Sequence, residues 1–189
     1  MKPILFNTEQ ARNILDGRKT NTRRPIKQSG WLERPLSREK DGSVWFATNR
    51  YTQFCCKPLY KRGDILYVRE TWAKRTFDER RFYYKADDNL GSILNREDDK
   101  WRPSIHMPRE AARIFLKVTD VRVERLQDIT EEDAIAEGIR IGLGGAPFFS
   151  CRDAYVAVWN AIYAKRGYSW NLNPWVWVYE FEQMKGEQG

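Results

Sequence analysis

The most regular alternation of apolar and polar residues lies in residues 113–126, RIFLKVTDVRVERL. Apolar residues recur at every second position on both sides of Asp120: Ile114, Leu116 and Val118 before it, Val121 and Val123 after it. A period of two is typical of a strand with one buried face. The pattern therefore predicts a long strand that bends near Asp120.

Shorter apolar, β-branched and aromatic runs predict further strands. These runs are PILF at 3–6, SVWFAT at 43–48, ILYV at 65–68, RRFYYKADD at 80–88 and WVWVYEF at 175–181. Gly63-Asp64 supplies turn chemistry before the third run, and the second run lies in an irregular stretch that we interpret as a hairpin excursion. Strand signals thus occur along the whole chain.

Three stretches carry helix start and stop signals. Each begins at a residue that can cap the first turn and ends at a glycine: Asn7 or Thr8 to Gly17, Thr130 to Gly138, and Ser150 to Gly167. In the last two, Asp133 and Asp153 stand at capping-box spacing. Six apolar residues share a face of the last helix, at 151–166: Ala154, Tyr155, Val158, Trp159, Ile162 and Tyr163. We expect this stripe to be core and not a base-stacking surface.

The helices are short and fall between strands without a regular βαβ rhythm, which favours an α+β fold. A small curved or closed sheet with two flanking helices fits this order best. We therefore predict a single domain over residues 1–189, with insertions at about 26–62 and 73–108. A polar loop is expected at 89–100 and a glycine-rich connection at 140–149, whose spacing does not match a phosphate-binding loop.

Charge and cysteine content narrow the function classes. Lys and Arg number 33 against 26 Asp and Glu, a net charge of +7 that favours polyanionic partners such as RNA or a nucleotide. Three cysteines give no disulfide framework, so we expect a reducing cytoplasm. A single histidine makes a metal site improbable, no cofactor is predicted, and no run of 18 apolar residues suggests a membrane span.

The segment GRKTNTRR, residues 17–24, concentrates four cationic side chains in eight positions. It can be a solvated charge run, a strip that grips phosphate, or one edge of an active site. Lys19 and Thr22 are three positions apart, so in a regular strand they would point to opposite faces. They can meet only if the chain turns between them, which Gly17 and Pro25 make easy.

Glu137 stands in the last turn of its predicted short helix. A carboxylate there meets the negative end of the helix dipole, at a cost of about 0.3–1 kcal/mol. A solvated glutamate that tolerates this penalty is the simplest interpretation, and a functional carboxylate is the alternative.

Four segments together resemble the ASCH domain, a relative of the PUA fold: ILDGRKTNTRR, GDILYVRETW, ITEEDAIAEG and NPWVWVYEF. The chain is most similar to the longer members found in phages and prophages, in which the segment from Trp101 to Pro108, WRPSIHMP, also recurs. The resemblance covers most of the chain outside 26–62 and 73–100. It implies a PUA-like β-barrel whose cleft accepts RNA or a nucleoside.

Some small ASCH proteins are amidohydrolases that remove the acetyl group from N4-acetylcytidine with a Lys, a Thr and a Glu. By motif position, the resemblance places these roles on Lys19, Thr22 and Glu137. The residue types suit the chemistry, because a threonine hydroxyl attacks only when a neighbouring base takes its proton. A lysine can be that base only if its pKa is lowered, as burial and nearby arginines would do.

Six further residues are candidates for binding the substrate: Arg23, Arg24, Arg69, Glu70, Trp72 and His106. Arg24 can hold a phosphate or stabilise charge on the acyl oxygen, and Trp72 can stack on a base. The structural alternatives are a surface Arg24, a Trp72 in the core and a hydrogen-bonded loop His106.

The chain is longer than the small amidohydrolases and has a denser basic segment, so the residue types transfer more safely than the substrate. We weigh two functions: an amidohydrolase for an N-acylated pyrimidine nucleoside, and a non-catalytic RNA- or nucleotide-binding module with a phage-related role. The residues supply no physical support for a role in virion assembly.

Overall fold

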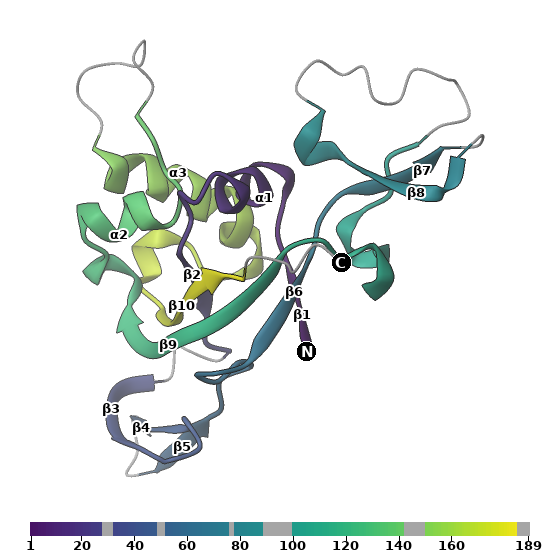
Figure 1. The fold of residues 1–189 in the computed structure, drawn as a ribbon. Helices are drawn as coiled ribbons and strands as arrows, with labels where there is room; N and C mark the ends of the chain where they lie inside the picture. Colours follow the sequence, from purple (N-terminus) through teal and green to yellow (C-terminus); the bar gives the residue numbers. More distant parts are fainter. Residues whose placement is uncertain (28–31, 49–51, 76–77, 89–99, 142–149, 185–189) are drawn as a thin grey trace. The chain divides into compact units, whose positions relative to one another are not determined.

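The chain forms two compact units in the computed structural model, which describes residues 1–27, 32–48, 52–75, 78–88, 100–141 and 150–184 (Figure 1). Unit 1 comprises Met1–Lys19, Asp64–Lys117 and Glu182–Gly189, and unit 2 comprises Thr20–Gly63 and Val118–Phe181. The predicted loops at 89–100 and 140–149 lie almost wholly outside the described residues. The assignment of one domain with two insertions stays a prediction.

In unit 1 the strand order is β1-β6-β9. Strand β1 (Lys2–Leu5) pairs in parallel with β6 (Ile65–Arg69), and β6 pairs antiparallel with the start of β9 (Phe115–Arg125), where Leu66 faces Leu116. A hairpin of β7 (Trp72–Arg75) and β8 (Asp78–Tyr84) follows β6. The remaining elements are helix α1 (Thr8–Leu15) and the 3-10 helices Lys85–Asp87, Ser104–His106 and Arg109–Ala111.

Helix α1 has the ends that its sequence predicts. Asn7 and Gln10 form a capping box at its start, and Gly17 adopts a left-handed φ of 70° after its last turn. The backbone N–H groups of Arg18 and Lys19 then both donate to the carbonyl of Asn13, at 2.8 and 2.9 Å. The helix end therefore fixes the backbone that carries Lys19.

In unit 2 the strand order is β9-β10-β2. Strand β10 (Trp175–Gln183) pairs antiparallel with β2 (Asn21–Pro25), which places Thr22 opposite Tyr179. The stretch that we interpret as a hairpin excursion forms a separate, three-stranded antiparallel sheet. Its strands are β3 (Leu32–Arg38), β4 (Val44–Thr48) and β5 (Gln53–Cys56). Unit 2 also holds α2 (Glu131–Ala136), α3 (Cys151–Tyr163) and the 3-10 helices Leu126–Asp128, Ala164–Arg166 and Trp170–Leu172.

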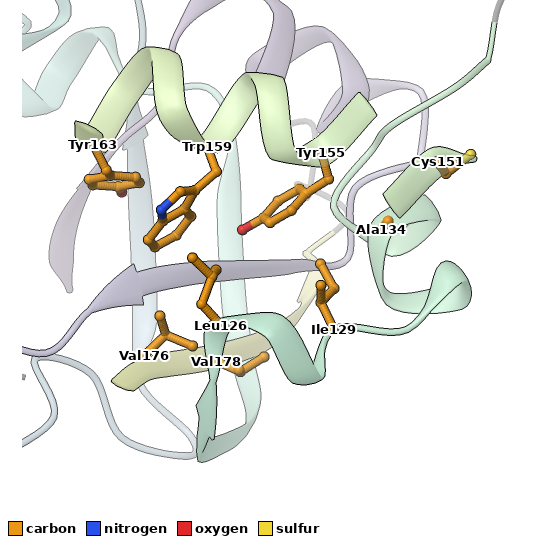
Figure 2. Packing of buried hydrophobic residues seen from close by; sticks show 9 residues of the cluster. All are labelled: Leu126, Ile129, Ala134, Cys151, Tyr155, Trp159, Tyr163, Val176 and Val178. Carbon is orange, nitrogen blue, oxygen red and sulfur yellow. The ribbon is translucent and has the colours of Figure 1, made fainter. Parts of the chain in front are cut away.

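The aromatic stripe of α3 is core, as predicted. Figure 2 shows Tyr155, Trp159 and Tyr163 pointing from the helix toward Val176 and Val178 of β10. Trp159 is 1% exposed, and its indole N–H donates to the carbonyl of Tyr168 at 2.7 Å. The polar tip of this residue is therefore satisfied inside the core.

The fold is α+β, as the order of elements predicts. The long strand predicted around Asp120 is β9, and the alternating residues Leu116, Val118 and Val121 are buried. The strand pairings among the described residues close no ring in either unit, so the barrel is not part of the observed fold. None of the helices in the described ranges is long and apolar enough to cross a membrane.

Thr130→Ala tests how strongly α2 depends on its cap. The Thr130 hydroxyl accepts the backbone N–H of Asp133 at 3.1 Å, and α2 has only six residues. We expect the variant to lower the free energy of unfolding by about 1 kcal/mol in urea denaturation. Thr130→Ser keeps the hydroxyl and should stay close to the wild type; equal losses in both variants would contradict the capping role.

Candidate functional site

Glu137 is the C-terminal cap residue of α2 and is buried, not solvated. Its backbone N–H donates to the carbonyl of Asp133 at 2.9 Å, and Gly138 leaves the helix with a φ of 90°. The residue is 6% exposed. Burial of a carboxylate is costly unless donors compensate it, so its surroundings decide what it can do.

The outer edge of β2 supplies one of these donors. Successive N–H groups of a strand point alternately toward its two sides. The N–H of Ile26 points toward β10 and donates to the carbonyl of Trp175. The N–H of Arg23, three positions earlier, therefore points away from β10. That N–H donates to Oε1 of Glu137 at 2.7 Å. Pro25 has no N–H, and Thr20 donates to the carbonyl of Ala136 at 2.8 Å. The end of α2 thus covers an edge strand.

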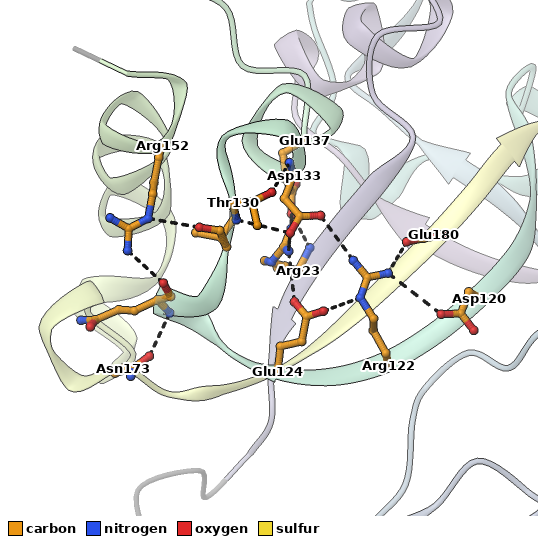
Figure 3. Close-up of polar contacts among 12 residues, drawn as sticks. Arg23, Asp120, Arg122, Glu124, Thr130, Asp133, Glu137, Arg152, Asn173 and Glu180 are labelled. Carbon is orange, nitrogen blue, oxygen red and sulfur yellow. Dashed lines mark hydrogen bonds and ion pairs between the residues drawn. The ribbon is translucent and has the colours of Figure 1, made fainter. Parts of the chain in front are cut away.

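The Arg23 side chain lies in a cluster of three carboxylates, Glu124, Asp133 and Glu137, which we call the carboxylate network (Figure 3). Its guanidinium is completely buried. Nη2 lies 2.8 Å from Asp133 Oδ2 and 3.2 Å from Glu124 Oε2, and Nη1 lies 3.7 Å from Glu137 Oε1. The structure therefore places Arg23 inside unit 2 and not on its surface.

Arg122 borders the same network from β9. It contacts Glu124 and Glu180, lies 3.3 Å from Asp133 Oδ1, and has a side chain that is 28% exposed (Figure 3). Two arginines thus share Glu124 and Asp133, one buried and one nearer to solvent.

Thr22 and Arg24 alternate with Arg23 along β2. Thr22 is 2% exposed. Arg24 is half-buried, and its Nη1 donates to the hydroxyl of Tyr163 at 2.9 Å. Burial alone would lower the pKa of Arg24, but Tyr163 and Glu137 raise the pKa above its ordinary value. Arg24 therefore keeps its charge within the field of Glu137.

Lys19 belongs to unit 1, whereas Thr22 and Glu137 belong to unit 2. Lys19 is 2% exposed, and its Nζ lies 5.7 Å from the centroid of the Phe6 ring. The Lys19 amine is thus buried against an aromatic ring, next to the helix end that fixes its backbone.

Glu70 forms a buried, bidentate ion pair with Arg113 in unit 1. It is 1% exposed, and Arg113 binds both of its oxygens, at 2.9 and 3.1 Å. Arg113 also contacts Asp87 at 2.7 Å and lies 3.9 Å from the centroid of the Tyr84 ring. Burial raises the pKa of Glu70, and the hydrogen bond from Arg113 opposes this shift. Within unit 1, Arg113 thus connects Glu70 to Asp87 and to Tyr84 at the end of β8.

The other predicted binding residues of unit 1 either contact the WRPSIHMP segment, residues 101–108, or belong to it. Trp72 is 4% exposed, packs with Met107, and exchanges backbone hydrogen bonds with Arg102, so its core interpretation is correct. Arg69 donates to the carbonyl of Ile105. His106 is exposed on a short 3-10 helix. The Arg102 guanidinium lies over the Trp72 ring, 5.1 Å from its centroid.

Sequence reasoning missed the residues that hold the candidate site. The apolar stripe predicts only a core role for Tyr163, yet its hydroxyl also accepts a hydrogen bond from Arg24, 139 positions away. The sequence pattern places Glu124 in a strand and Asp133 in a helix cap, and neither pattern indicates that Arg23 is their partner. The sequence carries one signal of this network: three consecutive acidic residues, at 131–133, carry charge opposite to that of the basic segment at 17–24.

No family model, curated protein or solved structure matches the chain. Within the described ranges, no group of three or more His, Cys, Asp or Glu side chains is arranged to hold a metal ion.

Tyr179, which lies opposite Thr22, is expected to make the folded protein less stable at alkaline pH. Burial raises its pKa from 10.0 to about 12, while the hydrogen bond from the Leu59 N–H opposes the shift. Because the folded pKa lies above the unfolded one, the stabilisation is complete below pH 10 and is lost as the pH rises toward 12.

We expect urea denaturation between pH 9 and pH 12 to show a shallower loss of stability in Tyr179→Phe than in the wild type, because the variant cannot ionise there. The contribution of one such group is roughly 3 kcal/mol over two pH units. Tyr67→Phe, at a half-buried tyrosine of β6, is the control. Identical slopes for the wild type and Tyr179→Phe would contradict the burial effect.

Proposed function

We propose that the chain is an amidohydrolase with an ASCH, PUA-like architecture that removes the acyl group from an N-acylated pyrimidine nucleoside such as N4-acetylcytidine. The observation that carries the proposal is the burial of all three residues to which the resemblance assigns catalysis. Lys19, Thr22 and Glu137 are 2%, 2% and 6% exposed. Buried polar and charged groups cost free energy and concentrate at functional sites.

The same burial counts against a strip that grips phosphate. In GRKTNTRR, Lys19 is buried, the Arg23 guanidinium is completely enclosed, and Arg24 is held by Tyr163. Arg18, with a side chain 25% exposed, pairs with Asp16 at 2.5 Å. Backbone phosphate contacts need accessible cations, so the basic segment suits a small enclosed substrate better than a nucleic-acid backbone.

In the proposed reaction the Thr22 hydroxyl attacks the acyl carbonyl carbon, and Lys19 takes its proton. The carbonyl oxygen becomes an oxyanion, which Arg24 stabilises. The C–N bond then breaks, and Glu137 passes to the leaving amine the proton that Thr22 lost to Lys19. Water hydrolyses the resulting acyl-threonine ester, which releases the carboxylic acid and restores the Thr22 hydroxyl.

Purified protein incubated with N4-acetylcytidine should release cytidine and acetate, as chromatography of the products would show. We expect Lys19→Arg, Thr22→Ala and Glu137→Gln each to lower kcat at least 100-fold, because each removes a group that moves a proton or attacks the carbonyl. Lys27→Ala, at an exposed lysine close to β2, is the matched control and should retain full activity.

The rival function, an RNA- or nucleotide-binding module without chemistry, has the net charge of +7 in its favour. It predicts that Lys19→Arg is tolerated and that binding weakens steeply with salt. Absence of turnover on every acylated pyrimidine nucleoside, together with salt-dependent RNA binding, would replace the amidohydrolase by this module.

Tyr163→Phe tests the role of Arg24 in substrate binding. The variant removes the hydroxyl that accepts the hydrogen bond from Arg24 and leaves the ring in the core. We expect KM for N4-acetylcytidine to rise about tenfold, because a less restrained guanidinium binds the substrate less well. Tyr168→Phe, at the periphery of the same core, is the matched control. An unchanged KM in Tyr163→Phe would remove this role from Arg24.

A further inference from the structure

A single residue holds the buried carboxylate of Glu137 at two points. The backbone N–H of Arg23 donates to Oε1 at 2.7 Å, and the Arg23 guanidinium approaches the same oxygen at 3.7 Å through Nη1. Figure 3 shows Arg23 on β2 directly beneath the helix end that carries Glu137. Both contacts therefore orient the same carboxylate oxygen.

The guanidinium that approaches Glu137 is itself held by two other carboxylates. Nη2 is bound to Asp133 and Glu124, and the side chain has no exposed surface. Asp133 stands in the first turn of α2 and Glu137 at its C-terminal cap. Arg23 thus contacts both ends of this six-residue helix and restrains the orientation of the Glu137 side chain.

Arg23 has unused donors on the side of Glu137. Nη1 and Nε are buried and have no hydrogen-bond partner in the described part of the chain. A buried donor without a partner costs free energy. The distance of 3.7 Å from Nη1 to Glu137 Oε1 is too long for a hydrogen bond. Hydrogen bonds at catalytic groups often tighten only when substrate is bound. The Nη1 donor is placed to bind Oε1 more closely at that stage.

We propose that Arg23 is a positioning residue for Glu137 and does not contact the substrate. This inference rests on the proposed amidohydrolase function and deepens it, because it assigns Arg23, in the denser basic segment, a role in orienting a proposed catalytic residue of unit 2. It predicts that kcat depends on the positive charge and the length of the side chain at position 23, because both orient Glu137. Substrate affinity depends on other residues.

The test compares Arg23→Met and Arg23→Lys with Arg122→Met. Arg122 is a matched control, because in the described structure its ion pairs go to Asp120, Glu124, Asp133 and Glu180, and not to Glu137. We expect Arg23→Met to lower kcat for N4-acetylcytidine about 100-fold with KM within threefold. Arg23→Lys should recover about tenfold of this loss, and Arg122→Met should keep kcat within twofold.

Thermal unfolding of each variant accompanies the kinetics. A similar loss of kcat in Arg122→Met would reduce Arg23 to a merely structural role and overturn the inference. A loss confined to KM in Arg23→Met would mean that Arg23 binds substrate, which would also overturn it. If Arg23→Met does not fold, Arg23→Lys decides: a kcat equal to that of the wild type would contradict the need for a guanidinium at Nη1.

A second measurement separates this inference from the proposed function. In protein labelled with 13C-glutamate, the side-chain carboxyl resonance of Glu137, assigned with Glu137→Gln, should move in Arg23→Lys and stay in place in Arg122→Met. If the wild type turns over no acylated nucleoside but this resonance moves, the function fails and the positioning contact stands. If the wild type is active and the resonance stays in place in Arg23→Lys, the positioning role fails.

Discussion

The structure of unit 2 depends on the compensation of one buried charge. The guanidinium of Arg23 has no exposed surface, and transfer of an uncompensated charge out of water costs several kcal/mol. Glu124 from β9 and Asp133 and Glu137 from α2 supply the opposite charge. Strand β2, strand β9 and helix α2 must therefore occupy one relative arrangement, because any other leaves a charge without a partner.

This constraint also shapes the candidate site. Glu137 accepts the outward N–H of Arg23, so the carboxylate that protects the edge of β2 is also the one for which we propose a role in proton transfer. The alternation of β2 then turns Thr22 and Arg24 away from the Arg23 side chain, and Tyr163 restrains Arg24. A short helix and an edge strand thereby hold three polar side chains in defined orientations, which is the preorganisation that catalysis requires.

Unit 1 uses the same principle with different residues. Glu70 is almost completely buried, and Arg113 binds both of its oxygens while it contacts Asp87 and stacks on Tyr84. A bidentate arginine pair of this kind fixes the carboxylate in two directions. Through Arg113, Glu70 is therefore connected to Tyr84 at the end of β8, a connection that its place beside Arg69 in the sequence does not indicate.

The sequence by itself determined the local structure, because caps, left-handed glycines and apolar alternation act between residues a few positions apart. It predicted the capping boxes at Thr130 and Ser150, the stops at Gly17 and Gly138, and the buried alternation of β9. Only the tertiary structure decided the partners of Arg23, the burial of Glu137 and the bond from Arg24 to Tyr163. These contacts join residues 101 to 139 positions apart, and their energies depend on desolvation and on distances that no local pattern encodes.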